Sequence, residues 1–253
     1  MNEAPRAPAV VKAVAVLRRL AEAPPAGPVR LATLAQDVGT AKSSLLTVLN
    51  ALLDGGLIQR SEAGYSLGPS LVGLSSAYLA GVNEIEAFYS ACRRSAQHLA
   101  DTIHLATFSA DVEISYLARI DGLTTPLVSP IGRSLPATCS ATGKALLSKL
   151  DEEEVSRRFD GVDAFPQLTS HSVANLEELL QELKVTRERG FGMDDEETTP
   201  GLLCVGMVVP TGFQPRWAVG ITMVKPADPE PRIREAVEVL RSVTRDIAHH
   251  LGH

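Results

Sequence analysis

The spacing of apolar and polar residues predicts a two-faced helix near the start of the chain. The stretch TAKSSLLTVLNALLDGG, residues 40–56, follows the 3.6-residue period of an α-helix. Its apolar face consists of Leu45, Val48, Leu49, Leu52 and Leu53, and its polar face of Ser43, Thr47, Asn50 and Asp54. Thr40 is the expected N-cap, and Gly55 and Gly56 are expected to end the helix. The apolar face indicates a core, and the polar face is either solvated or a contact surface.

The segments around this helix predict a winged helix-turn-helix. Residues 9–23 are amphipathic and stop at the Pro24–Pro25 pair, and residues 29–39 form a second short helix that ends at Gly39. Two strand-like runs follow at 57–60 and 65–68, separated by SEAG. Helix, helix, turn, helix and hairpin within about 60 residues is the order of that DNA-binding fold.

The rest of the chain predicts a linker helix and a domain of mixed helices and strands. Pro69 opens a helix that runs to Gly81, and a longer helix is expected at about 83–101. Strands are expected at 104–109, 113–120, 190–197, 201–210 and 217–224, a loop at 129–140, and helices at 141–150, 175–188 and 230–250. We therefore expect an α+β fold, with a winged helix-turn-helix at 1–68, a linker helix at 69–82 and a sensor-like domain at 83–253.

The bulk composition is typical of a globular cytoplasmic protein. The 253 residues suit two domains, and no apolar run approaches the roughly 20 residues that span a bilayer. Cys92, Cys139 and Cys204 are odd in number and widely spaced, which argues against a disulfide framework or a zinc site. We expect no association with membranes.

Charge is unevenly distributed along the chain. The formal net charge is −6, but residues 1–70 hold seven basic and five acidic residues, so the remainder carries −8. A small basic domain attached to an acidic body suits a nucleic-acid binder joined to a sensor, although an excess of two positive charges is modest.

Taken together, the motifs resemble the IclR-type transcriptional regulators over nearly the whole chain. The supporting stretches are KAVAVLRRLAE, LATLAQDVGTAKSSLLTVLNALLDGGLIQR, YSLGPSLVGL, PIGRSLPATCSATGKALLSKL, and ERGFGMDDEETTPGLLCVGMVVP followed by WAVGITM. Each is weak alone, and their order and spacing carry the resemblance. It implies a ligand-responsive DNA-binding regulator with a GAF-like effector-binding domain, working as a homodimer or as a tetramer built from two dimers. Repression is the commoner behaviour in such families, so a repressor is expected.

The chain departs from the family pattern in its recognition helix. Leu46 and Thr47 stand where the family often has a His-Arg pair, and the wing SEAGYSLG lacks the basic residue often found before its final Leu-Gly. Contacts to double-stranded operator DNA are therefore expected to rely on short polar side chains and few cationic ones. The candidate DNA-binding residues are Lys42, Ser43, Ser44, Leu46, Thr47, Asn50 and Arg60, with Arg6 as a further cation.

The expected effector is a small organic acid, aromatic acids included. In SLPATCSATGKALL, small residues and hydroxyls open a helix whose N–H groups and dipole would favour a carboxylate, and an ordinary capped helix is the alternative. By resemblance, the pocket residues are Leu127, Leu135, Ala141, Thr142, Asp194, Leu202, Cys204, Gly220 and Thr222. Gly220 stands where relatives carry Ser, which predicts room for a bulkier ligand. Asp194 is expected to accept a hydrogen bond from a ligand hydroxyl, or else to order its loop.

Two other functions remain open on the sequence alone. A cysteine-dependent enzyme would use Cys139 or Cys204 with a distant His, but neither thiol lies in a catalytic signature, so no catalytic residue is assigned. A ligand-binding module with a degenerate DNA-binding domain is suggested only by the missing Arg. Neighbouring carboxylates in the extended run 194–197 alternate in direction and cannot all converge, so we expect neither a metal site nor a cofactor.

Overall fold

The computed structural model describes residues 7–22, 27–96, 100–122, 131–162, 164–212 and 216–253. The chain divides into two compact units, Met1–Gly81 and Val82–His253. Each unit has its own hydrophobic core. No helix in the described part of the chain is both long and apolar enough to cross a membrane.

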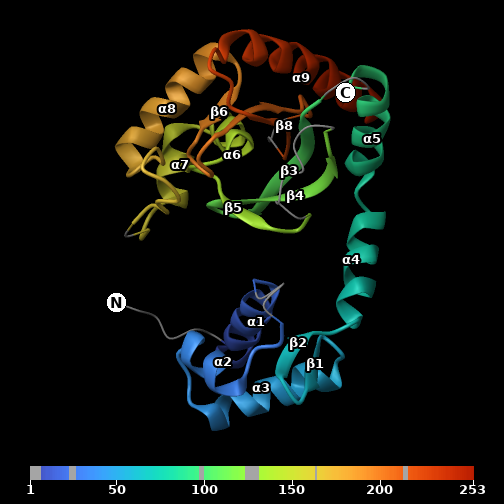
Figure 1. Cartoon of the computed structure of the whole chain (residues 1–253), viewed down its shortest axis with the longest axis vertical. Coiled ribbons are helices and arrows are strands. Elements are labelled where there is room, and N and C mark those ends of the chain that lie inside the picture. The colour runs from blue at the N-terminus through green and yellow to red at the C-terminus, as the bar shows by residue number, and fades with distance from the viewer. Residues whose placement is uncertain (1–6, 23–26, 97–99, 123–130, 163, 213–215) are drawn as a thin grey trace. The chain divides into compact units, whose positions relative to one another are not determined.

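The first unit has the element order of a winged helix-turn-helix followed by a further helix (Figure 1). Its elements are α1 (Pro8–Ala21), α2 (Leu31–Asp37), α3 (Lys42–Asp54), β1 (Ile58–Ser61), β2 (Gly64–Leu67) and α4 (Ser70–Ala80). The strands β1 and β2 form an antiparallel hairpin, which is the wing. Every element that the sequence predicted in this unit is present.

The leucine face of α3 forms the centre of the first core. Leu45 and Leu49 have no exposed surface and pack with Val16 and Leu20 of α1 and Leu34 of α2. Burying a leucine side chain contributes roughly 1.5–3 kcal/mol, so this one face accounts for much of the unit's stability.

The predicted start of α3 is wrong by one residue. The N-cap is Ala41, not Thr40, and it makes no side-chain capping hydrogen bond. The end of α3 agrees with the sequence, because Gly55 is the C-cap and Gly56 has a φ of +65°, a left-handed conformation that glycine adopts without steric cost.

Helix α4 packs against no core, since none of its residues is buried. Val72 is 68% exposed and Tyr78 is 52% exposed, and Leu74 is also exposed. Apolar side chains are exposed on α1 as well, where Val10 and Val14 face solvent. An apolar helix that buries nothing within its own unit offers surface for a partner.

The second unit is built on a six-stranded antiparallel sheet in the order β5-β4-β3-β8-β7-β6. The strands are β3 (Thr102–Ala110), β4 (Glu113–Ile120), β5 (Ser134–Pro136), β6 (Gly192–Asp195), β7 (Leu202–Val208) and β8 (Trp217–Val224). The helices are α5 (Asn83–Ser95), α6 (Ala141–Leu147), α7 (Glu152–Arg158), α8 (Leu176–Arg189) and α9 (Glu230–His250).

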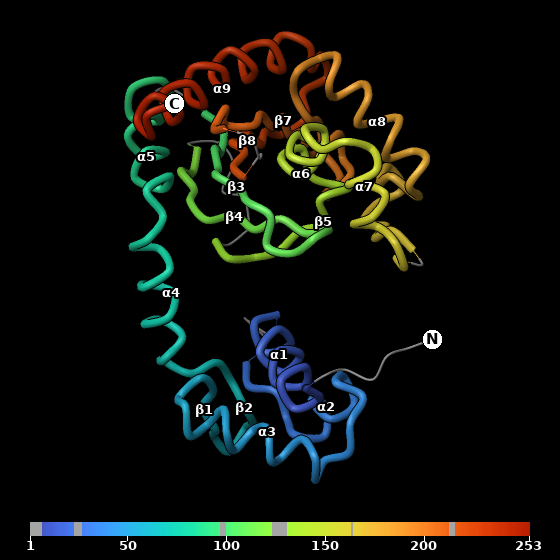
Figure 2. The backbone as a smooth tube through the Cα atoms, turned by 180° about the vertical axis from the view of Figure 1, so that it is seen from behind, coloured from blue at the N-terminus to red at the C-terminus, as the bar shows by residue number. Residues whose placement is uncertain are grey.

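Helices cover both faces of this sheet. On one face, α5 and α9 pack on the apolar residues of β3, β7 and β8, such as Leu105, Val205 and Ile221. On the other face, α6, α7 and α8 pack around Ala106 and Ala218. Figures 1 and 2 show α5 beside α9, and α6, α7 and α8 gathered together. The second face carries the site described below.

Three details of the second unit differ from the sequence prediction. The helix expected at 83–101 ends as α5 at Ser95, and β3 begins at Thr102. The expected loop at 129–140 contains β5, which pairs with β4. Helix α7 was not predicted, because its sequence EEEVSRR buries only Val155 and shows no apolar period; the Asp151 side chain caps it by accepting from the Glu154 N–H.

Candidate DNA-contact face and effector cavity

The polar face of α3 is free for contact within its unit. Lys42, Ser43, Ser44, Thr47 and Asn50 are all exposed, and Leu46 is 36% exposed. Arg60, on the wing strand β1, is also exposed, with its guanidinium 5.7 Å from the centroid of the Tyr65 ring. The structure therefore presents every candidate DNA-binding residue of 42–60 to solvent, whereas Arg6 lies outside the described residues.

A cavity of about 200 Å³ lies within the second unit, on the sheet face that carries α6. It is lined by Thr102, His104, Tyr116, Arg119, Arg133, Leu135, Leu168, Thr198, Thr199, Leu202, Cys204 and Thr222. Three leucines form the apolar part of the cavity wall, and two arginines and several hydroxyls form its polar part. This combination of apolar wall and a few oriented polar groups is the usual character of a small-molecule site.

Strand pairing explains how the cavity residues reach one face. Thr102 pairs with Thr222 on β8, and Thr222 pairs with Cys204 on β7, so these three side chains project to the same side. A β-bulge in β4 adds Tyr116 and Arg119: His104 pairs with Arg119, but Ala106 pairs with Tyr116, which leaves Leu117 unpaired. Strict alternation would have placed Tyr116 and Arg119 on opposite faces.

Four of the nine predicted effector residues line this cavity: Leu135, Leu202, Cys204 and Thr222. Ala141, Thr142, Asp194 and Gly220 are not among its lining residues, and Leu127 lies outside the described part of the chain. The other eight lining residues were not predicted, among them His104, Tyr116, Arg119 and Arg133. No local pattern marks them, because strand register and the bulge in β4 bring them together.

The start of α6 is a closed, capped helix end. Ser140 is the N-cap, and its hydroxyl accepts from the Gly143 N–H at 3.1 Å. Ala141 and Thr142 are buried. The N–H of Gly143 is thus already satisfied by the protein, as in the ordinary capped helix that the sequence left open as the alternative.

The prediction that Gly220 leaves room for a larger ligand is wrong. A Cβ added at Gly220 would lie 2.4 Å from Nε2 of His104 and 2.8 Å from Cγ2 of Thr142. Both distances are shorter than ordinary van der Waals contact. The space beside Gly220 is therefore filled by protein side chains and not by part of the cavity.

Asp194 orders its own loop. Its carboxylate accepts from the Glu197 N–H at 2.8 Å, the Thr198 N–H at 3.2 Å and the Thr198 hydroxyl at 2.6 Å. Of the neighbouring acids, Glu197 pairs with the buried Lys144, and both Asp195 and Glu196 pair with Lys225. The four carboxylates therefore divide among three sets of partners and do not converge on one centre.

The cysteines are in surroundings that suppress the thiolate. Cys139 and Cys204 are both buried, and burial is the largest cause that raises the pKa of each thiol, well above its usual range for Cys204. A nucleophilic cysteine needs the opposite shift.

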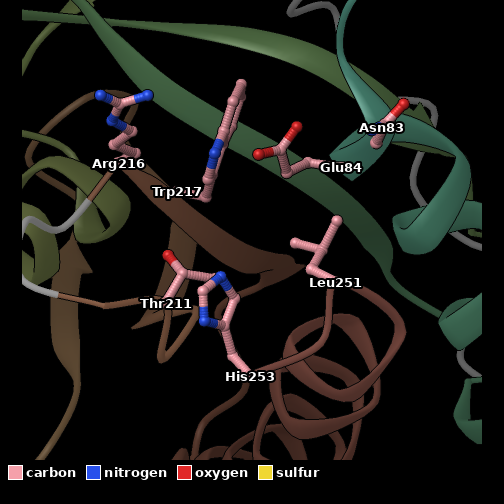
Figure 3. A pocket seen from close by; sticks show the side chains of 7 residues that line it. All are labelled: Asn83, Glu84, Thr211, Arg216, Trp217, Leu251 and His253. Atoms are coloured by element: carbon pink, nitrogen blue, oxygen red, sulfur yellow. The ribbon is translucent and has the colours of Figure 1, made fainter.

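A second hollow in the same unit shares no residue with the cavity on the α6 face. It lies where α5, β8 and the end of α9 meet, and Asn83, Glu84, Thr211, Arg216, Trp217, Leu251 and His253 line it (Figure 3). Figure 3 shows Glu84 of α5 extending toward the side chain of Trp217. Only Trp217 among these residues is buried, so this hollow is part of the open surface.

Comparison with known proteins identifies both units. The family model described as the bacterial transcriptional regulator IclR C-terminal domain matches residues 76–249, and that of the IclR helix-turn-helix domain matches residues 9–62. The chain belongs to the IclR family. It is therefore a DNA-binding transcriptional regulator with a C-terminal effector domain, and not an enzyme.

Two regulators from Escherichia coli are among the curated relatives of this IclR-family chain. The HTH-type transcriptional regulator KdgR is 31% identical over 252 residues, covering 96% of this chain and 92% of KdgR. The transcriptional repressor IclR is 28% identical over 196 residues, covering 72% of this chain and 68% of that protein. Both are named as regulators of transcription.

Two of the solved structures that share the fold illustrate the match. IclR from Thermotoga maritima matches with a TM-score of 0.69 and 25% identity, covering 96% of this chain and 98% of that one. An IclR homologue from Microbacterium hydrocarbonoxydans, solved in complex with 4-hydroxybenzoate, matches with a TM-score of 0.73 and 17% identity over 95% of this chain and 99% of that one. At that identity the second comparison concerns the fold alone.

Proposed function

We propose that this IclR-family regulator is a repressor whose effector is a small organic acid, aromatic acids included, bound in the cavity on the α6 face of the sheet. The observation that carries the proposal is the pair of arginines, Arg119 and Arg133, at a cavity that otherwise offers leucines and hydroxyls. A guanidinium binds a carboxylate through two parallel hydrogen bonds, which suits an acid. The 4-hydroxybenzoate in the Microbacterium homologue and the name of the E. coli repressor support the same class of function.

Arg133 is the better candidate for the carboxylate contact. Arg119 already forms an ion pair with Asp121 at 2.9 Å, which reduces its capacity for a second anion. Arg133 lies at the exposed edge of the cavity, beside Leu135 of β5. These contacts, and not the capped end of α6 at Ala141 and Thr142, are where we place the acid group.

Calorimetric titration tests the effector proposal. Hydroxybenzoates, keto acids and sugar acids are titrated into the wild type, into Arg133→Gln and into Arg216→Gln. Arg216 is an exposed arginine of the same unit that does not line the cavity, so it is the matched control. Loss of a charged hydrogen bond costs about 1.5–3 kcal/mol, so Arg133→Gln should weaken binding at least tenfold while Arg216→Gln does not. The proposal fails if no acid binds, or if the two variants bind alike.

The operator is proposed to lie against the polar face of α3. The exposed residues Lys42, Ser43, Thr47 and Asn50 are set on a helix whose other face is core, so α3 can enter a major groove without unfolding its unit. Fluorescence anisotropy with DNA from upstream of the gene for this protein measures binding. For a repressor, bound operator lowers transcription from a reporter, and the effector acid restores it.

Assembly of two chains through α1 and α4 is proposed from their uncovered apolar side chains. Val10 and Val14 on α1, with Val72, Leu74 and Tyr78 on α4, are all exposed. Pairing these helices would place two recognition helices at half-sites about 34–36 Å apart, or a multiple of that spacing. Light scattering should give the mass of at least a dimer for the wild type. Val72→Asp, which places a charge on this apolar surface, should lower the measured mass of the assembly. A wild-type monomer at micromolar concentration that binds a single half-site tightly contradicts the assembly.

A further inference from the structure

One row of residues crosses the sheet beneath the cavity and beneath α6. The strand register aligns Gly192, Gly206, Gly220, His104 and Arg119 across five neighbouring strands. The first two glycines carry α6: an added Cβ at Gly192 would lie 2.0 Å from the Ala141 carbonyl oxygen, and one at Gly206 would lie 2.6 Å from the Ala141 carbonyl carbon. The same row therefore supports α6 at one end and reaches the cavity at the other.

The imidazole of His104 takes the place that a side chain at position 220 would need. The position of an added Cβ at Gly220 is 2.4 Å from Nε2 and 3.0 Å from Cε1 of His104. The ring also packs on Tyr116, with 4.1 Å between the ring centroids. Glycine at position 220 thus leaves room for the imidazole to lie over β8 beside Tyr116.

His104 is a neutral hydrogen-bonding group at the cavity wall. The residue is only 4% exposed, and burial followed by the nearby charge of Arg119 lowers its pKa to about 3. A neutral imidazole has one N–H donor and one nitrogen acceptor. Hydroxyls of Thr102 and Thr222 line the same cavity. This wall suits an uncharged oxygen of a ligand better than a second carboxylate or a methyl group.

We propose that His104 and Gly220 form one specificity-determining unit, in which Gly220 admits the imidazole to the cavity wall and His104 recognises a hydroxyl or carbonyl oxygen of the bound acid. The inference rests on the proposed function, because it takes the cavity as the effector site. It narrows the effector to hydroxy and keto acids, and it assigns His104 a ligand contact that the sequence did not mark.

The packing of the pair is tested without any ligand. Thermal unfolding is followed by the fluorescence of Trp217, the only tryptophan of the chain, for the wild type, Gly220→Ala, His104→Ala and the double variant. Gly220→Ala should lower Tm by about 4 °C or more in the wild type, as expected for overpacking, and by less than half as much when His104 is alanine. Gly206→Ala is the matched control, because its Cβ meets the backbone of α6 and its cost should be the same in both backgrounds. If Gly220→Ala lowers Tm equally with His104 present and with His104 replaced by alanine, the proposed pairing of His104 and Gly220 is overturned.

Recognition is tested with pairs of acids that differ by one oxygen. Calorimetry compares 4-hydroxybenzoate with benzoate and pyruvate with propionate, on the wild type, His104→Ala and His104→Gln. For at least one pair, the wild type should bind the acid with the additional hydroxyl or keto oxygen about tenfold more tightly. His104→Ala should lose that preference, and His104→Gln, which keeps a neutral donor and acceptor, should retain part of it. A general loss of fold would weaken both members equally, so the ratio isolates the contact.

The outcomes separate this inference from the proposed function. If acids bind the wild type and the preference survives in His104→Ala, the acid effector stands and the ligand contact of His104 is overturned. If no acid binds the wild type, the effector proposal fails and the ligand contact fails with it, while the unfolding experiment still decides whether His104 and Gly220 are one unit.

Discussion

Acidification should destabilise the second unit through His104. In the folded chain, burial and then the charge of Arg119 lower the pKa of His104 to about 3, from 6.5. The folded state therefore holds the imidazole neutral, while the unfolded chain protonates it near its usual pKa. The stability that depends on a neutral His104 is fully present above pH 6.5 and is lost as the pH falls toward 3.

The size of the effect follows from the two pKa values. At pH 7.5 the imidazole is neutral in both states, and at pH 5 only the unfolded state is protonated. Each pH unit below 6.5 then costs about 1.36 kcal/mol, so pH 5 removes roughly 2 kcal/mol of unfolding free energy. Tyr116 and Cys204 are other titratable side chains that line the same cavity. Burial raises the pKa of each, which moves it further from the range between pH 5 and 7.5.

The measurement compares the wild type with His104→Gln at both pH values. Urea unfolding is followed through Trp217, which reports on the second unit only. The comparison with the variant is needed because Glu197 also titrates in this range. Burial raises the pKa of Glu197 to about 7, so its contribution to the unfolding free energy is present at low pH and is lost as the pH rises. The wild type should lose roughly 2 kcal/mol more than the variant on acidification. Equal losses, or an NMR titration of His104 near pH 6.5, refute the reasoning.

Four further substitutions test the fold and the DNA-contact face. Thr47→Ala and Ser43→Ala should each weaken operator binding by about 1 kcal/mol with unchanged Tm, because both side chains are exposed on the polar face of α3; wild-type affinity in anisotropy titrations with both variants would contradict that face. Leu49→Ala should destabilise the first unit by roughly 2–5 kcal/mol, measured by circular dichroism, since Leu49 is fully buried; an unchanged melting curve would mean that another face is the core. Gly192→Ala should lower the stability of the second unit by roughly 1–3 kcal/mol in thermal unfolding, because its Cβ would meet the Ala141 carbonyl oxygen at 2.0 Å; an unaltered Tm would show that α6 is not seated on this glycine.

The first unit was predictable because its signals are local. The 3.6-residue period of a helix shows its buried face within two turns. Of the five apolar residues predicted on α3, Leu45, Val48, Leu49 and Leu52 are buried and Leu53 is partly buried. The glycines that end α3 were equally visible in the sequence. The cap at Thr40 failed because any residue with extended backbone can precede a helix, as Ala41 does here without a side-chain hydrogen bond.

The cavity was less predictable because its members come from separate strands. Cys204 and Thr222 were expected by resemblance, and they do line it. His104 reads in the sequence as an isolated histidine in a strand, and its role depends on pairing with Gly220, more than a hundred residues away. The error at Gly220 has the same origin: a missing side chain predicts empty space only if no neighbour occupies it.

The bulge at Leu117 divides β4 into two segments of opposite phase. Before it, Tyr116 faces the cavity, and after it, Arg119 does so, although the two positions differ by an odd number. Removing Leu117 would remove the bulge, and Tyr116 and Arg119 would then lie two positions apart and still face the cavity by simple alternation. If all four residues 116–119 were kept in a regular strand without the bulge, one of the two side chains would turn to the other side of the sheet. The side chains that β4 contributes to the cavity therefore depend on the length and pairing of the strand, and not only on its residue types.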